Sequence, residues 1–110
     1  MLPELIAGLD AIVPTVYGAW KPGTAPPLPY IAIVDTGRDD MYADDMIYHR
    51  DYTYRIEFYF ENKDPKAEQT IESFFDAHDF AYDCDGDEYI DTEKMFERIY
   101  YLEKGESTHD

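Results

Sequence analysis

The chain has 110 residues, 45% of them hydrophobic and 16% aromatic, which is enough for one domain with an apolar core. Its 25 acidic residues outnumber its 9 lysines and arginines and give a formal net charge of -16 at pH 7. This charge argues against direct nucleic-acid binding, because the average surface would repel phosphates.

The acidic excess leaves three interpretations open: a solvated surface, an acidic wall past which DNA moves without binding, or an imitation of DNA that occupies a basic protein. Cys84 is the single cysteine, so no intrachain disulfide is possible and a reducing compartment suits the chain. The first residues lack the basic lead and apolar run of a secretion signal, and no segment reaches membrane-spanning length. We therefore expect a soluble, intracellular protein.

Apolar residues at spacings of three and four predict an amphipathic helix over residues 2–13, which Pro14 ends. The prolines and glycines of residues 15–29 predict an extended connector without regular helix. Residues 30–35 are rich in β-branched side chains and predict the first strand of a sheet.

The acidic segment 38–45 ends in Asp44 and Asp45, a pair that predicts a hairpin turn. A strand follows over residues 46–61, open to an interruption near Asp51. Its apolar side chains fall at every second position, which indicates one buried face. These side chains are Tyr52, Tyr54, Ile56, Phe58 and Phe60.

Asp64 and Pro65 predict the start of a second helix, which ends near His78. An aspartate side chain accepts hydrogen bonds from the free amides of the first turn, and a proline there loses no needed donor. The apolar stripe of this helix consists of Ala67, Ile71, Phe74 and Phe75.

Residues 80–84 and 93–102 are further strand candidates, and residues 105–110 are expected to form a flexible tail after a single domain over 1–104. The predicted order is α-β-β-β-α-β-β. It indicates an α+β fold with two helices and an antiparallel sheet of four to five strands.

Asp83, Asp85 and Asp87 alternate in the way that begins an EF-hand calcium loop. Glu88 stands where that loop needs glycine, and Lys94 stands where it needs a bidentate glutamate. The three aspartates are therefore a weak metal candidate, and a solvated acidic turn is the alternative.

No other pattern indicates chemistry. His49, His78 and His109 have no metal-ligand spacing with one another or with Cys84, and the chain has no glycine-rich phosphate loop. The sequence predicts a protein that is not an enzyme and takes no cofactor.

Tyrosines alternate along the predicted strands, so some fall on each face of the sheet. Two short helices cover only part of such a sheet, and tyrosine favours surfaces buried against another chain. The sequence therefore predicts a homo-oligomer or a component of an assembly, although tyrosines filling one large core would give the same pattern. The candidate interface residues are Tyr52, Tyr54, Tyr59, Tyr100 and Tyr101.

Several short motifs follow one another in a specific order. They are the N-terminal helix, Val16-Tyr17-Gly18, Leu28-Pro29-Tyr30, Ala43-Asp44-Asp45 before Tyr48, Ile56-Glu57-Phe58-Tyr59, Lys63-Asp64-Pro65, and Tyr89-Ile90 before Glu93-Lys94-Met95-Phe96. Together, over residues 2–103, they resemble the small head-tail joining and tail-terminator-like proteins of long-tailed phages and prophages of Gram-positive bacteria.

The resemblance implies a virion structural protein with no catalytic residue. Its subunits would form a ring, expected as a hexamer, that stops growth of the tail tube and gives the head a docking surface. The implied partners are the tail tube protein and a head-completion protein, with no sequence-specific nucleic-acid binding and no membrane. The implied location is the virion, with assembly in the cytoplasm of the host bacterium.

Under this resemblance, acidic residues would line the ring opening and let DNA pass without binding it. The candidates are Asp39, Asp40, Asp44, Asp45, Asp85, Asp87 and Glu88. The rival interpretations are an acidic DNA-mimic inhibitor of a DNA-binding protein and a calcium-binding protein with a degenerate EF-hand-like loop.

Overall fold

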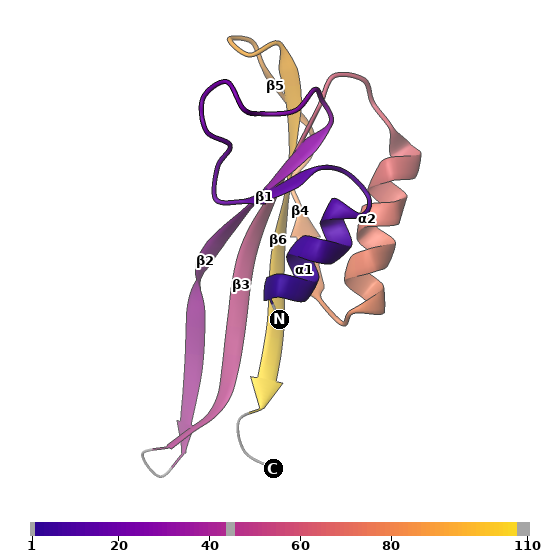
Figure 1. The fold of residues 1–110 in the computed structure, drawn as a ribbon. Coiled ribbons are helices and arrows are strands. Elements are labelled where there is room, and N and C mark those ends of the chain that lie inside the picture. Colours follow the sequence, from indigo (N-terminus) through magenta and orange to yellow (C-terminus); the bar gives the residue numbers. More distant parts are fainter. Residues whose placement is uncertain (1, 44–45, 108–110) are drawn as a thin grey trace.

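A computed structural model describes residues 2–43 and 46–107, with the backbone alone for residues 38–43, 46–50 and 106–107. Figure 1 shows two helices packed against one twisted sheet. The elements in chain order are α1 (Leu2–Asp10), β1 (Thr15–Tyr17), β2 (Tyr30–Ala43), β3 (Met46–Phe60), α2 (Pro65–Ala77), β4 (Ala81–Cys84), β5 (Glu88–Ile90) and β6 (Met95–Ser107).

The described residues form a sheet of six strands in the order β1-β2-β3-β6-β4, with β5 also paired to β6. β1 runs parallel to β2, and the other pairs are antiparallel. The α+β class with two helices is therefore confirmed. The prediction of a purely antiparallel sheet of four to five strands is corrected to a mixed sheet of six.

The two additional strands are short and lie in segments whose composition indicated loops. β1 lies in the predicted connector and pairs with β2, and next to it the amide of Ile31 donates to the carbonyl of Pro14 at 2.8 Å. β5 lies in the predicted acidic turn and pairs with β6 from Glu88 to Ile90. Three residues are too few for a hydrophobic pattern, so backbone pairing alone defines both strands.

The long strands continue past their predicted ends. β2 extends through the acidic segment to Ala43, and β3 passes Asp51 without a break, because the two strands pair along this whole length. β6 pairs with β3 as far as Ser107, so residues 105–107 belong to a strand and not to a tail. The predicted turn at Asp44 and Asp45 lies outside the described residues.

The start of α2 follows the prediction. The Asp64 carboxylate accepts a hydrogen bond from the amide of Ala67 at 3.1 Å, and Pro65 is the first helical residue. α1 ends at Asp10, earlier than predicted, and the Asp10 carboxylate accepts from the amide of Thr15 at 2.9 Å. This contact directs the chain from the helix into β1.

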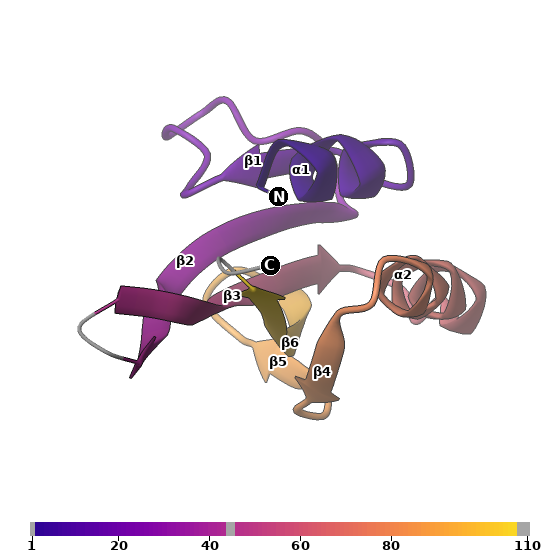
Figure 2. The ribbon, with the colours of Figure 1, turned by 90° about the horizontal axis from the view of Figure 1, so that it is seen from below.

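Both helices contribute to one core on one face of the sheet. Figure 2 shows α1 over the β1 end of the sheet and α2 toward the β4 end. The burial of apolar side chains in this core is the main contribution to the stability of the fold. The buried side chains are Leu5, Leu9, Val13, Ile31, Ile33, Tyr54, Ile56, Phe58, Phe60, Ile71, Phe75, Phe80, Tyr100 and Leu102.

The far half of the sheet extends beyond the helices. Residues 38–43 of β2, 46–51 of β3 and 106–107 of β6 form a three-stranded ribbon, which we call the arm (Figure 1). The arm makes the molecule elongated, with extents of 52 × 28 × 23 Å. The radius of gyration of 15.5 Å exceeds the value of about 13 Å expected for a compact chain of this length.

The two helices meet at Gly8, where a β-carbon would overlap the ring of Phe74. Alanine in a helix gains about 1 kcal/mol over glycine, but overpacking costs about 1–3 kcal/mol. We expect Gly8→Ala to lower the free energy of unfolding in urea by about 1 kcal/mol. Gly86→Ala is the control, because its added methyl group would meet no atom within 4 Å; equal effects of the two changes would contradict the close helix packing.

Candidate functional site

Within residues 2–43 and 46–107, no helix or loop covers one half of the sheet face opposite the helices. The pairing registers align Val34, Arg55, Tyr101 and Asp83 in one row across β2, β3, β6 and β4. Because side chains alternate along strands, these residues lie on the face away from the core. We define the open face as Val34, Thr53, Arg55, Asp83, Ile99, Tyr101 and Glu103.

The connector covers the other half of this face. It forms a groove of about 360 Å³ with Tyr30, Glu57 and Tyr59 from the sheet. The Trp20 ring packs edge-on against Tyr30, with centroids 5.9 Å apart. No described helix or loop plays this role over the open face.

Polar contacts link the two halves. Arg55 Nε lies 2.9 Å from Glu57 Oε2, and the Tyr59 hydroxyl donates to Glu57 Oε1 at 3.1 Å. Burial, followed by hydrogen bonding to Glu97 and the charge of Glu57, raises the pKa of Tyr59 far above its ordinary value. Tyr59 is therefore a neutral hydrogen-bond donor at physiological pH.

Tyr101 is the aromatic residue of the open face. Its side chain is 44% exposed, and its hydroxyl donates to Asp85 Oδ2 at 3.2 Å. This hydrogen bond is the main reason that the pKa of Tyr101 is raised. The contact also fixes the direction of an otherwise free ring.

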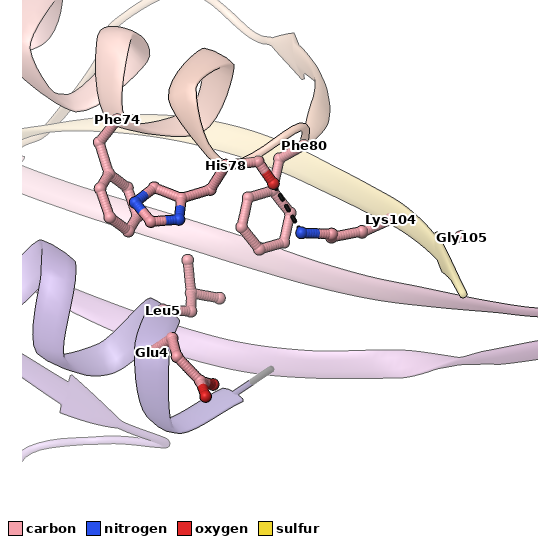
Figure 3. A pocket seen from close by; sticks show the side chains of 7 residues that line it. All are labelled: Glu4, Leu5, Phe74, His78, Phe80, Lys104 and Gly105. Atoms are coloured by element: carbon pink, nitrogen blue, oxygen red, sulfur yellow. Dashed lines mark hydrogen bonds between the residues drawn. The ribbon is translucent and has the colours of Figure 1, made fainter. Parts of the chain in front are cut away.

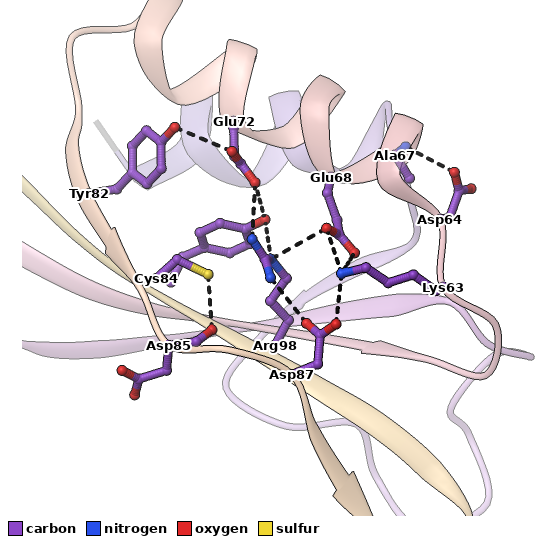
Figure 4. Close-up of polar contacts among 11 residues, drawn as sticks. Lys63, Asp64, Ala67, Glu68, Glu72, Tyr82, Cys84, Asp85, Asp87 and Arg98 are labelled. Atoms are coloured by element: carbon purple, nitrogen blue, oxygen red, sulfur yellow. Dashed lines mark hydrogen bonds and ion pairs between the residues drawn. The ribbon is translucent and has the colours of Figure 1, made fainter.

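A second polar cluster lies on the helix side of the sheet, between α2 and β6 (Figure 4). Arg98 Nη1 lies 3.1 Å from Asp87 Oδ1, and Arg98 Nη2 lies 3.5 Å from Glu72 Oε2. Arg98 Nε donates to the Tyr100 hydroxyl at 2.9 Å, which in turn donates to Glu72 at 2.7 Å. One guanidinium group thus ties the acidic loop to the second helix.

Lys63 completes this cluster from the other side. Its amine lies 2.7 Å from Asp87 Oδ2 and 2.7 Å from Glu68 Oε2. Glu68 is only 7% exposed, and a carboxylate so deeply buried requires a nearby cation. No sequence pattern predicts this cluster, because its members come from three separate segments of the chain.

The structure does not bring the three predicted metal ligands together. Asp85 bonds Tyr101 of the open face, whereas Asp87 bonds Lys63 and Arg98 on the helix side. Figure 4 shows the Asp85 carboxylate pointing away from Asp87. Within residues 2–43 and 46–107, no group of three acidic, histidine or cysteine side chains forms a metal site.

The predicted interface tyrosines fall into different environments. Tyr54 is 4% exposed and Tyr100 is 0% exposed, so the protein's own core removes both from any subunit interface. Tyr52 packs against the core, and Tyr59 lies half-buried beneath the connector. Tyr101 alone offers a largely accessible ring.

The predicted lumen residues do not form one surface. Asp39 and Asp40 lie on the β2 strand of the arm, whereas Glu88 opens β5 at the opposite end of the sheet (Figure 1). Asp85 and Asp87 are engaged by Tyr101, Lys63 and Arg98 as described above. Asp44 and Asp45 lie outside the described residues.

A pocket of about 310 Å³ lies between the two helices and the end of β6 (Figure 3). Phe74, Phe80 and Leu5 form its apolar wall. Lys104 Nζ donates to the carbonyl of His78 at 2.7 Å and lies 5.1 Å from the centre of the Phe80 ring. A cation on the last carbonyls of a helix is a stabilising cap, so this lysine has a structural role.

Comparison with known protein families and with curated proteins finds no match for this chain. Among the described residues, neither helix has the length and apolar character needed to cross a lipid bilayer.

The Arg98 cluster leads to a prediction about stability. Arg98→Met would leave Glu68, Glu72 and Asp87 with Lys63 as their nearest cation, so we expect the free energy of unfolding to fall by about 2 kcal/mol. Lys66→Met removes the same charge from an exposed site and is expected to change stability by less than about 0.5 kcal/mol. Urea unfolding measures both, and equal losses would show that net charge, not the cluster, sets the effect.

The same cluster predicts a pH dependence. Burial alone would raise the pKa of Asp87, but the hydrogen bonds and charges of Lys63 and Arg98 outweigh it and lower the pKa below the ordinary 3.8. A carboxyl group whose pKa is lower in the folded than in the unfolded state stabilises the fold at pH values above its unfolded-state pKa. This contribution is lost as the pH falls through the folded-state pKa. Asp87→Asn should therefore lower the free energy of unfolding at neutral pH, and its difference from the native chain should shrink below pH 3.8. A difference that stays constant with pH would contradict this assignment.

Proposed function

We propose that the protein is a virion structural subunit of a phage or prophage, a tail terminator or head-tail connector that assembles into a ring. The observation that carries the proposal is the arm, whose outer strand has a backbone edge that no other described strand pairs with. The order of sequence motifs in residues 2–103 supports the choice of a phage protein among oligomeric proteins.

The free edge belongs to β2. β1 pairs with it only from Ile31 to Ile33, and among strands formed by described residues none but β3 pairs with β2 beyond that point. Residues 34–43 therefore present backbone groups on one side without a strand partner. Such an edge is a template for a strand from another chain.

The register identifies which amides point outward. The Ile31 amide and the Ile33 carbonyl bond the β1 segment, and these residues oppose Phe58 and Ile56 of β3. Backbone amides point to alternate sides along a strand, and the bulge between Asp35 and Gly37 adds one residue to β2. The β2 residues that oppose Tyr52 and Arg50 therefore also direct their amides outward. Those residues are Arg38 and Asp40.

The proposed mechanism depends on the balance between backbone pairing and charge. Each added strand supplies several backbone hydrogen bonds, which act against repulsion between subunits that each carry -16. Salt screens that repulsion without weakening backbone pairing to the same degree. An acidic ring opening would then let DNA pass, because no phosphate would be neutralised.

In this role the ring caps the tail tube protein on one side and meets a head-completion protein on the other. The subunit contributes no catalysis. The virion and the host cytoplasm are the corresponding locations.

Removal of one outward amide tests the proposal. Asp40→Pro deletes that amide on an edge strand, where proline is tolerated, and Asp40→Asn makes the same change of charge while keeping the amide. We expect the native chain and Asp40→Asn to form rings whose mass by light scattering increases with salt, whereas Asp40→Pro stays monomeric and folded by circular dichroism. A native chain that remains monomeric at every concentration and salt level would contradict the proposal.

Electron microscopy of the same samples tests the phage assignment. Rings that bind the ends of isolated tail tubes would support the terminator role. A salt-sensitive complex with a basic DNA-handling enzyme and no rings would instead support the DNA-mimic interpretation.

A further inference from the structure

The open face differs chemically from the free edge of the arm. Its centre combines half-buried Val34 and Ile99 with the exposed ring of Tyr101. An uncovered apolar centre of this kind, surrounded by polar groups, is typical of a surface that binds another molecule.

The rim of the open face is acidic. Asp83 pairs with Tyr101 from β4, and Glu103 lies two residues further along β6; both are exposed. Asp85 accepts a hydrogen bond from the Tyr101 hydroxyl. Among the residues that define the open face, Arg55 is the only basic one. Its Nε already lies 2.9 Å from Glu57 Oε2. The face therefore offers unpaired negative charge around an aromatic ring.

This chemistry selects among possible occupants. A second open face would bring acids against acids, and nucleic acid or an anionic membrane surface would bring phosphates against the same acids. A positively charged protein segment would instead be attracted by these acids. Arginine fits better than lysine, because its planar group stacks on an aromatic ring and pairs with carboxylates in bidentate fashion.

We propose that the open face is a docking site for an arginine-rich segment of a different protein, with a guanidinium group stacked on Tyr101 and neighbouring arginines paired with Asp83 and Glu103. The ring of Tyr101 is held by Asp85, so little side-chain freedom is lost on binding. This inference deepens the proposed function by assigning the face that meets a non-identical partner, while the arm edge joins identical subunits.

The probe is a fluorescein-labelled peptide of nine arginines, whose binding is followed by anisotropy. We expect saturable binding that weakens with salt, tighter than that of the matching nine-lysine peptide. Tyr101→Ala should raise the dissociation constant of the arginine peptide by about fivefold or more. Tyr89→Ala is the matched control, because Tyr89 is 50% exposed outside the open face, and it should leave the constant unchanged.

Amide chemical shifts locate the peptide on the native chain. Shifts that gather at Arg55, Asp83 and residues 99–103 support the proposal. Equal affinity for native and Tyr101→Ala proteins, or shifts that gather on α2 or the connector, would overturn it in favour of unspecific attraction to an acidic protein.

The two proposals fail separately. Asp40→Pro should bind the arginine peptide as the native chain does, and Tyr101→Ala should keep the ring mass. Loss of rings with intact peptide binding contradicts only the proposed function, and the reverse result contradicts only the docking site.

Discussion

Two helices of 9 and 13 residues pack against one face of a six-stranded sheet whose longest strands have 13 to 15 residues. The helices cannot cover so long a sheet, so the core is confined to the part beneath them. Every other notable surface follows from this mismatch. The arm is the part of the sheet that extends past the helices, and the open face is the part of the opposite side that the connector does not reach.

Two of the nine lysines and arginines, Lys63 and Arg98, lie where acidic side chains are crowded between α2 and β6. Between Lys66 and Lys94 the sequence has ten acidic residues and no lysine or arginine. Lys63 and Arg98 reach into this segment from outside it and pair with Glu68, Glu72 and Asp87. The structure therefore divides this acidic segment in two. On the helix side its acids pair with Lys63 and Arg98, whereas on the open face Asp83 remains exposed.

The parts of the fold that could be predicted are those that local sequence patterns determine. The alternation from Tyr52 to Phe60 predicted a strand with one buried face, and the Asp64 cap predicted the start of α2. Local patterns do not indicate β1, β5 or the extension of β2 to Ala43, because pairing with neighbouring strands, not side-chain pattern, holds these residues in the sheet. Alternation also could not separate Tyr100, which is in the core, from Tyr101 on the open face, because the face that each strand turns to the helices depends on tertiary packing.

We propose that the backbone edge of β2 beyond Ile33 is completed by another copy of the chain. Hydrogen exchange of the full chain, compared between dilute and concentrated solutions, tests this claim at individual amides. If copies pair along this edge, the outward amides of Arg38 and Asp40 exchange rapidly in dilute solution and become protected in concentrated solution, while core amides such as that of Ile56 stay protected in both. Equally rapid exchange of the two edge amides at all concentrations would contradict it.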